Sequence, residues 1–146
     1  MIDVEWKGGR AFEANPPSGN RFTMDAYPES GGHNLGPTPM EAFLASMAAC
    51  SATDVIGILE KKKLNVSSYR LEVEGERGPE GVYPRPYKRI TLRHIVEGAG
   101  IDPKAVEQVV RLSDEKYCSV AATLRSAPEI ETSFEVLEPE PAAVGS

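Results

Sequence analysis

The segment from Pro39 to about Lys63 constrains the fold most, because it can form one uninterrupted helix. Thr38 can cap its start, Pro39 suits the first helical position, and Glu41 stands three residues after the cap, as a capping box requires. At about 1.5 Å per residue such a helix measures about 40 Å, which is long for a chain of 146 residues. We therefore expect this helix to be central.

The middle of this helix, residues 45–53, consists almost entirely of small residues. Small side chains permit the close approach of a second helix or of another subunit. A single chain of 146 residues does not easily cover such a long apolar helix. We therefore expect an obligate homodimer whose subunits do not separate without unfolding.

The segments around the long helix alternate between turn signals and strand or helix patterns. Short strands at residues 4–6 and 21–26, separated by the turn-rich residues 15–20, predict a small antiparallel sheet at the N-terminus. Alternating apolar and polar residues over Ser68–Glu76 and Lys88–Val96 predict two strands that each bury one face. A proline-rich loop that is too long for a tight turn joins them.

The C-terminal third is predicted to be helical and then extended. Asp102 and the following proline start a second helix, a break follows at residues 113–117, and a short helical piece runs from Cys118 to about Ser126. Alternation over Glu129–Glu138 predicts a last strand. We expect one domain over residues 1–138 and a flexible tail over residues 139–146.

Composition excludes several classes of function. The net charge of −6 argues against a nucleic-acid partner, because proteins that bind phosphate backbones carry basic surfaces. No stretch approaches the roughly 18 consecutive apolar residues of a membrane span, and the N-terminus lacks the basic and then apolar pattern of a signal peptide. We expect a cytoplasmic protein that does not bind membranes.

The two cysteines are too few for a disulfide scaffold, so in a reducing cytoplasm they indicate redox chemistry, metal binding or burial. Cys50 and Cys118 lie far apart in the chain, and neither has a second Cys or a His at the spacing of metal ligands. The only histidines, His33 and His94, are isolated and are interpreted as ordinary loop or strand residues. We expect no metal and no cofactor.

Each cysteine has a chemical and a non-chemical interpretation. Helical spacing places Cys50 on one stripe with Phe43 and Met47, where it faces an apolar surface as either a reactive thiol or a small core residue. Cys118 lies at the first turn of a short helix, where the helix dipole favours thiolate, although it could also be a residue of the capping region without chemistry. Neither position is decisive alone.

Two separated motifs resemble one family. The segment GPTPMEAFLASMAACSATDV, residues 36–55, resembles the GPSPME…GCTAIDV signature of OsmC-like proteins in the OsmC/Ohr superfamily, particularly the YhfA-like branch. The segment SDEKYCSV, residues 113–120, is similar to the second cysteine motif of that family. The resemblance covers about residues 2–138.

The resemblance implies an α+β fold in which antiparallel sheets of an intertwined homodimer wrap around central long helices, with active sites at the dimer interface. It also implies peroxidase chemistry in the oxidative-stress response. Cys50 attacks an organic hydroperoxide, becomes sulfenic acid and condenses with Cys118 to a disulfide. A dithiol reductant, which in related proteins is lipoylated protein or dihydrolipoamide, then restores the thiols.

The resemblance is incomplete at the helix start. One branch of the superfamily consists of organic-hydroperoxide-resistance proteins, and we call it the peroxidase branch. In this branch a Glu directly after the helix-starting Pro pairs with an Arg that holds the reactive thiolate. In this chain the residue after Pro39 is Met40, and Glu41 comes one place later. Glu41 is about 13 Å along the helix from Cys50 and on its opposite side, so it acts on the thiol only from a partner subunit or after a break in the helix. Otherwise it serves the capping box. Arg10 resembles the arginine of that branch, and Arg21 is its rival.

Two functions therefore follow from the sequence. One is a thiol-dependent peroxidase that uses Cys50, Cys118, Arg10 and Glu41. The other is a non-catalytic stress dimer that binds a small apolar ligand or a partner protein and keeps its cysteines for packing or redox sensing. The distance between the cysteines distinguishes the two, because a disulfide needs Cα atoms within about 7 Å or a motion that brings them there.

Overall fold

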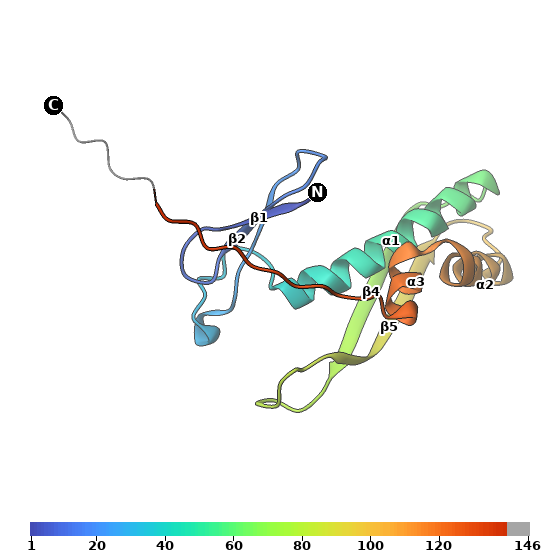
Figure 1. Cartoon of the computed structure of the whole chain (residues 1–146). Coiled ribbons are helices and arrows are strands. Elements are labelled where there is room, and N and C mark those ends of the chain that lie inside the picture. The colour runs from blue at the N-terminus through green and yellow to red at the C-terminus, as the bar shows by residue number, and fades with distance from the viewer. Residues whose placement is uncertain (140–146) are drawn as a thin grey trace.

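The computed structural model of the chain describes residues 1–139 and has an α+β fold with a long central helix (Figure 1). This helix, α1 (Pro39–Lys61), begins with a complete capping box: Thr38 Oγ1 accepts the Glu41 N–H at 3.2 Å, and a Glu41 carboxylate oxygen accepts the Thr38 N–H at 2.8 Å. The predicted helix and its start are confirmed.

Three short strands form the N-terminal sheet, β1 (Asp3–Trp6), β2 (Phe12–Asn15) and β3 (Phe22–Met24). They are antiparallel in the order β1-β2-β3. The predicted small sheet is confirmed. Strand β2 was not predicted, because it has four residues and only Ala14 among them is buried.

A long hairpin packs against α1. Its strands are β4 (Ser68–Arg77) and β5 (Tyr87–Glu97), and their bounds agree closely with the predicted ones. Gly75 of β4 makes room for the ring of Tyr87, because a Cβ at this position would overlap the ring atoms. The alternating apolar residues of both strands face α1, as their period of two requires.

The C-terminal helices lie on the same part of α1 (Figure 1). Helix α2 (Pro103–Leu112) starts where the Asp102 carboxylate accepts the Lys104 N–H at 3.0 Å. A π-helical turn, η2 (Ser113–Tyr117), replaces the predicted break, and α3 (Ser119–Ser126) follows it. Val55 and Leu59 of α1 and Val109 of α2 form the buried centre of this packing, each at most 1% exposed.

The last predicted strand is wrong for this chain taken alone. Residues 127–139 form neither helix nor strand, and Ile130 and Phe134 are 86% and 92% exposed. Alternation alone does not make a strand, because the backbone must also pair with an edge strand, and this segment pairs with neither sheet. Of the predicted tail, residues 140–146 lie outside the described residues.

Asp25 fixes the loop that leads into α1. Its carboxylate is 1% exposed and accepts the backbone N–H groups of Ala26, His33 and Leu35 at 2.8, 3.0 and 3.1 Å. The Ala26 bond chiefly lowers the pKa of Asp25 below its ordinary value of 3.8, against the opposing effect of burial, and the other two bonds add to it.

The lowered pKa predicts how stability responds to acid. A group whose pKa is lower in the folded state contributes stability above its ordinary pKa and loses it as the pH falls through the folded value. Urea unfolding at pH 6 and pH 3 should therefore show that the wild type loses more stability than Asp25→Asn over this range. An equal loss of stability in both proteins would show that the ionised carboxylate of Asp25 does not stabilise the fold.

Candidate active site

The two cysteines lie side by side, although they are far apart in the sequence. Cys118 is 3% exposed and belongs to a buried cluster with Met47 and Ala121, and Cys50 packs against this cluster while remaining partly exposed. Both are free thiols, and they lie close enough that the Cys50 thiol raises the pKa of Cys118. The fold thus brings the predicted pair together.

Each thiol comes from a different helix. Cys50 lies in the middle of α1, and Cys118 is the residue that caps the start of α3. Ile90 and Leu92 of β5 complete an apolar wall around them. Because strand residues two apart share a face, the alternation of β5 directs both side chains toward the helices.

Burial makes Cys118 a poor thiolate. Removal from water raises the pKa of Cys118 above its ordinary value of 9.0, the backbone amides of Ala121 and Val120 lower it in part, and the neighbouring Cys50 thiol raises it again. The prediction that the helix start favours thiolate at Cys118 is therefore wrong, because desolvation outweighs the amides. Cys118 is a protonated thiol at neutral pH.

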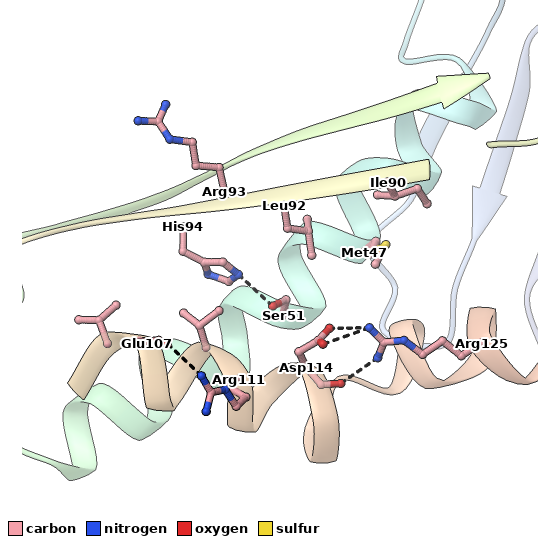
Figure 2. A pocket seen from close by; sticks show the side chains of 12 residues that line it. Met47, Ser51, Ile90, Leu92, Arg93, His94, Glu107, Arg111, Asp114 and Arg125 are labelled. Atoms are coloured by element: carbon pink, nitrogen blue, oxygen red, sulfur yellow. Dashed lines mark hydrogen bonds and ion pairs between the residues drawn. The ribbon is translucent and has the colours of Figure 1, made fainter. Parts of the chain in front are cut away.

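Three polar side chains, Tyr69, His94 and Ser51, lie in a row that ends at the residue after Cys50; Figure 2 shows His94 and Ser51. The Tyr69 hydroxyl is 2.6 Å from His94 Nδ1, and His94 Nε2 is 3.5 Å from the hydroxyl of Ser51, the residue after Cys50. Burial lowers the pKa of His94, and the Asp114 carboxylate opposes this effect. His94 was interpreted as an ordinary strand residue. The only sequence signal for its role was its place on the buried face of the strand.

His94 and Ser51 open on a cavity of about 600 Å³ between β5, α1 and the C-terminal helices (Figure 2). Met47 and Leu92 give it an apolar side. Its charged rim includes Arg93 and two ion pairs: Arg125 binds Asp114 at 2.9 Å, and Arg111 binds Glu107 at 2.9 Å. Neither cysteine lines this cavity.

A second, more apolar cavity adjoins the thiol cluster. It has a volume of about 330 Å³ and shares Ile90 with the wall around the cysteines. Met40 and Phe43 of α1 line it together with Tyr87, whose ring stacks on Phe43 at 6.0 Å between centroids. The Tyr87 hydroxyl donates to the Met40 carbonyl at 3.1 Å. Met40 thus contributes to an apolar space that shares Ile90 with the wall around the thiols but is lined by neither cysteine.

Glu41 does not reach the cysteine of its own chain. It closes the capping box, accepts a hydrogen bond from the Tyr27 hydroxyl, and lies on an α1 that runs unbroken past Cys50. The Tyr27 hydroxyl, and after it the Thr38 amide, lower the pKa of Glu41. Within one chain its contacts are those of a helix cap.

Neither candidate arginine lies at the thiols. Arg10 is in the connection between β1 and β2, and its guanidinium donates to the Gly9 carbonyl at 3.5 Å. Arg21 is exposed and lies 3.9 Å from Glu13. The N-terminal sheet that carries both lies beyond the first turn of α1, away from α3 (Figure 1). Among residues 1–139, no group of three His, Cys, Asp or Glu side chains could hold a metal ion.

Comparison with known proteins adds to this description. A family model described as OsmC-like protein matches residues 32–133. The chain is 39% identical to Protein YhfA of Escherichia coli (strain K12) over 134 residues, which cover 92% of this chain and 96% of that protein. Protein YhfA of Shigella flexneri matches equally.

Solved structures with the same fold are also similar. A hypothetical protein from Aquifex aeolicus VF5 has a TM-score of 0.73 and 31% identity, and the match covers 96% of this chain and 97% of that one. An organic hydroperoxide resistance protein OsmC from Legionella pneumophila has a TM-score of 0.60 and 19% identity, with 86% and 89% covered. At this identity the second likeness concerns the fold alone.

Proposed function

The chain belongs to the OsmC-like protein family, and from that premise we propose that it is a thiol-dependent peroxidase that reduces organic hydroperoxides. The observation that carries the proposal is the pairing of a partly exposed Cys50 with a buried Cys118. An incoming hydroperoxide meets the exposed thiol first, and the second thiol is already in place to react with the product. Some structures of this fold bear the name organic hydroperoxide resistance protein.

The proposed reaction has three steps. The Cys50 thiolate attacks the terminal oxygen of R–O–O–H, the O–O bond breaks, and the products are Cys50 sulfenic acid and the alcohol, which takes up one proton. The Cys118 sulfur then attacks the sulfenic sulfur, and water leaves as the disulfide forms. A dithiol reductant returns two electrons and two protons to the cysteines by thiol–disulfide exchange.

An apolar cavity that shares Ile90 with the wall around the thiols supports an organic rather than an inorganic peroxide; neither cysteine lines it. Met40 and Phe43 offer about 330 Å³ of apolar space, which suits the alkyl group of the substrate. As the reductant we propose a lipoylated protein or dihydrolipoamide, whose vicinal thiols can capture both cysteine sulfurs in turn. Both partners fit a cytoplasmic role in the oxidative-stress response.

Arg10 and Glu41 enter this proposal only through a second subunit. In its own chain each is distant from Cys50, so a catalytic role for either requires that the partner brings it to the thiol. A guanidinium at that position would hold the thiolate and stabilise the charge that develops on the leaving oxygen. If Glu41 serves this arginine, it does so in addition to its capping contacts.

The single chain leaves apolar surface that a second copy would cover. Contrary to the expectation that no stretch of the sequence approaches a membrane span, an 18-residue stretch of α1 has a mean hydropathy of 1.7, apolar enough by composition to cross a bilayer. Only 22% of this stretch is buried. The N-terminal sheet exposes Trp6 at 67% and Phe22 at 48%. Exposed apolar patches of this kind mark interfaces between proteins or with membranes, and we propose a homodimer.

Sedimentation should therefore show a dimer at micromolar concentration without detergent. The apolar surface predicts that the dimer persists on dilution until the chain unfolds, because a monomer would expose α1 to water. A folded monomer at micromolar concentration would contradict the homodimer. Recovery of the protein only with detergent would instead favour a membrane role for α1.

A second function is favoured by the larger cavity. The space of about 600 Å³ next to His94 contains neither thiol, and it is of the size that small ligands occupy. A stress dimer that binds an apolar ligand there, with its cysteines for packing or redox sensing, would need no peroxide chemistry. Stopped-flow mixing of the reduced protein with cumene hydroperoxide separates the two functions. The peroxidase loses its thiols much faster than free glutathione does and, once a dithiol reductant is added, consumes many hydroperoxides per subunit, whereas a binding protein or redox sensor does not turn over.

A further inference from the structure

Ser113 makes hydrogen bonds toward both segments that carry a cysteine. Its hydroxyl donates to the carbonyl of Ser51, the residue after Cys50, at 3.3 Å. Its own carbonyl accepts the N–H of Cys118 at 2.8 Å. Ser113 is 0% and Ser51 is 3% exposed, so water does not compete for these bonds. We call the two bonds together the serine link.

The second of these bonds closes an unusual turn. It joins Ser113 to the residue five positions later and so forms the π-helical turn η2, which sets where Cys118 begins α3. Single π turns are rare and frequently occur at functional sites. The first bond ties the start of the same turn to α1. As a residue inside α1, Ser51 uses one lone pair of its carbonyl for the helix, and Ser113 takes the other.

A second contact holds the turn but contributes less. Arg125 of α3 binds the carboxylate and the carbonyl of Asp114 at 2.9 and 3.0 Å. The side chains of this pair are 59% and 47% exposed, and exposed ion pairs contribute little to stability. The buried link through Ser113 is therefore the stronger constraint between α1 and the start of α3.

We propose that Ser113 is a positioning residue that holds the Cys118 thiol against Cys50 and so promotes the disulfide between them. Ser113 acts through the backbone of both segments and does not touch the reacting sulfur atoms. The use of this disulfide in peroxide turnover rests on the proposed function. The positioning itself does not, because it follows from the packing of the reduced protein.

Equilibration with glutathione measures the positioning directly. In this exchange two thiols of the protein and one oxidised glutathione give the Cys50–Cys118 disulfide and two reduced glutathiones, so that two electrons and two protons pass to glutathione. The equilibrium constant reports the effective concentration of one cysteine thiol toward the other. Because no peroxide takes part, a failed peroxidase proposal leaves this test intact.

Ser113→Ala should lower this equilibrium constant about fivefold, the loss expected for one buried hydrogen bond. The matched control is Ser126→Ala at the exposed end of α3, whose hydroxyl donates to the nearby Thr123 carbonyl at 3.0 Å. This control should keep the wild-type constant. The proposal would be overturned if the equilibrium constant of Ser113→Ala equalled that of the wild type, or if both variants lowered the constant equally.

A second pair of variants covers the case in which Ser113→Ala does not fold. Ser113→Thr and Ser113→Val add the same volume to the buried position and differ in the hydroxyl alone. The Thr variant should have a constant about fivefold above that of the Val variant. Equal equilibrium constants in these two variants would show that the hydroxyl bond of the serine link does not promote the disulfide. The urea midpoint of each reduced variant, measured alongside, separates general destabilisation from lost positioning.

Discussion

Replacing Cys50 with Ser should abolish peroxide turnover, whereas Cys118→Ser should consume about one peroxide per subunit and then stop. The reason lies in the unequal burial of the two thiols. Cys50 is partly exposed, while Cys118 is 3% exposed and its pKa is raised by burial, so only Cys50 can start the reaction. Without Cys118 the sulfenic acid forms but has no partner thiol.

The measurement is hydroperoxide consumption by the reduced protein after the reductant has been removed, together with trapping of sulfenic acid by dimedone. The reductant is left out because an excess dithiol reduces a sulfenic acid directly and would keep Cys118→Ser turning over. Cys118→Ser should accumulate the dimedone adduct on Cys50, and Cys50→Ser should form none. Ser126→Ala, which changes an exposed hydroxyl on the helix that Cys118 caps, is the control and should consume hydroperoxide like the wild type. Equal residual consumption in both cysteine variants would contradict the assignment of roles.

Leu59→Ala should destabilise the fold by about 3 kcal/mol, a typical cost of emptying a buried leucine site. Leu59 is 0% exposed and lies where α1, α2 and the β4–β5 hairpin meet, beside Val55 and Val109. The neighbours come from three rigid elements and can close the cavity only in part. Loss of this contact loosens α2, which leads directly into the turn before Cys118.

Urea unfolding at one fixed protein concentration measures this cost, because a dimer makes stability depend on concentration. Leu35→Ala is the control, since Leu35 is 66% exposed in the loop before α1, and it should change stability little. A cost below about 1 kcal/mol for Leu59→Ala would mean that this cluster is not the centre of the core.

Local signals in the sequence predicted the elements that the structure contains. The capping box at Thr38 and Glu41 fixed the start of α1, and alternation gave the bounds of β4 and β5 closely. The same alternation failed at residues 129–138, because a strand also needs an edge to pair with, and sequence does not show that edge. Strand β2 was missed because four residues carry too little pattern.

The sequence predicted which two cysteines belong to the candidate site, but it did not predict that they are in contact. The family motifs pointed to Cys50 and Cys118, but their contact depends on how α2 and η2 return the chain to α1, which no local pattern encodes. For the same reason the raised pKa of Cys118 was missed, since burial is a tertiary property that here outweighs the local helix start. The link of Ser113 to Ser51 is a contact of this kind as well.

The central claim is that Cys50 and Cys118 of one chain form a redox pair when the protein meets an organic hydroperoxide. Peptide mapping without reductant, after one equivalent of cumene hydroperoxide, tests it most directly. We predict one disulfide within the chain, between the peptides that contain Cys50 and Cys118, and the loss of both free thiols. Two unmodified thiols after this exposure, or a disulfide between chains, would contradict the account.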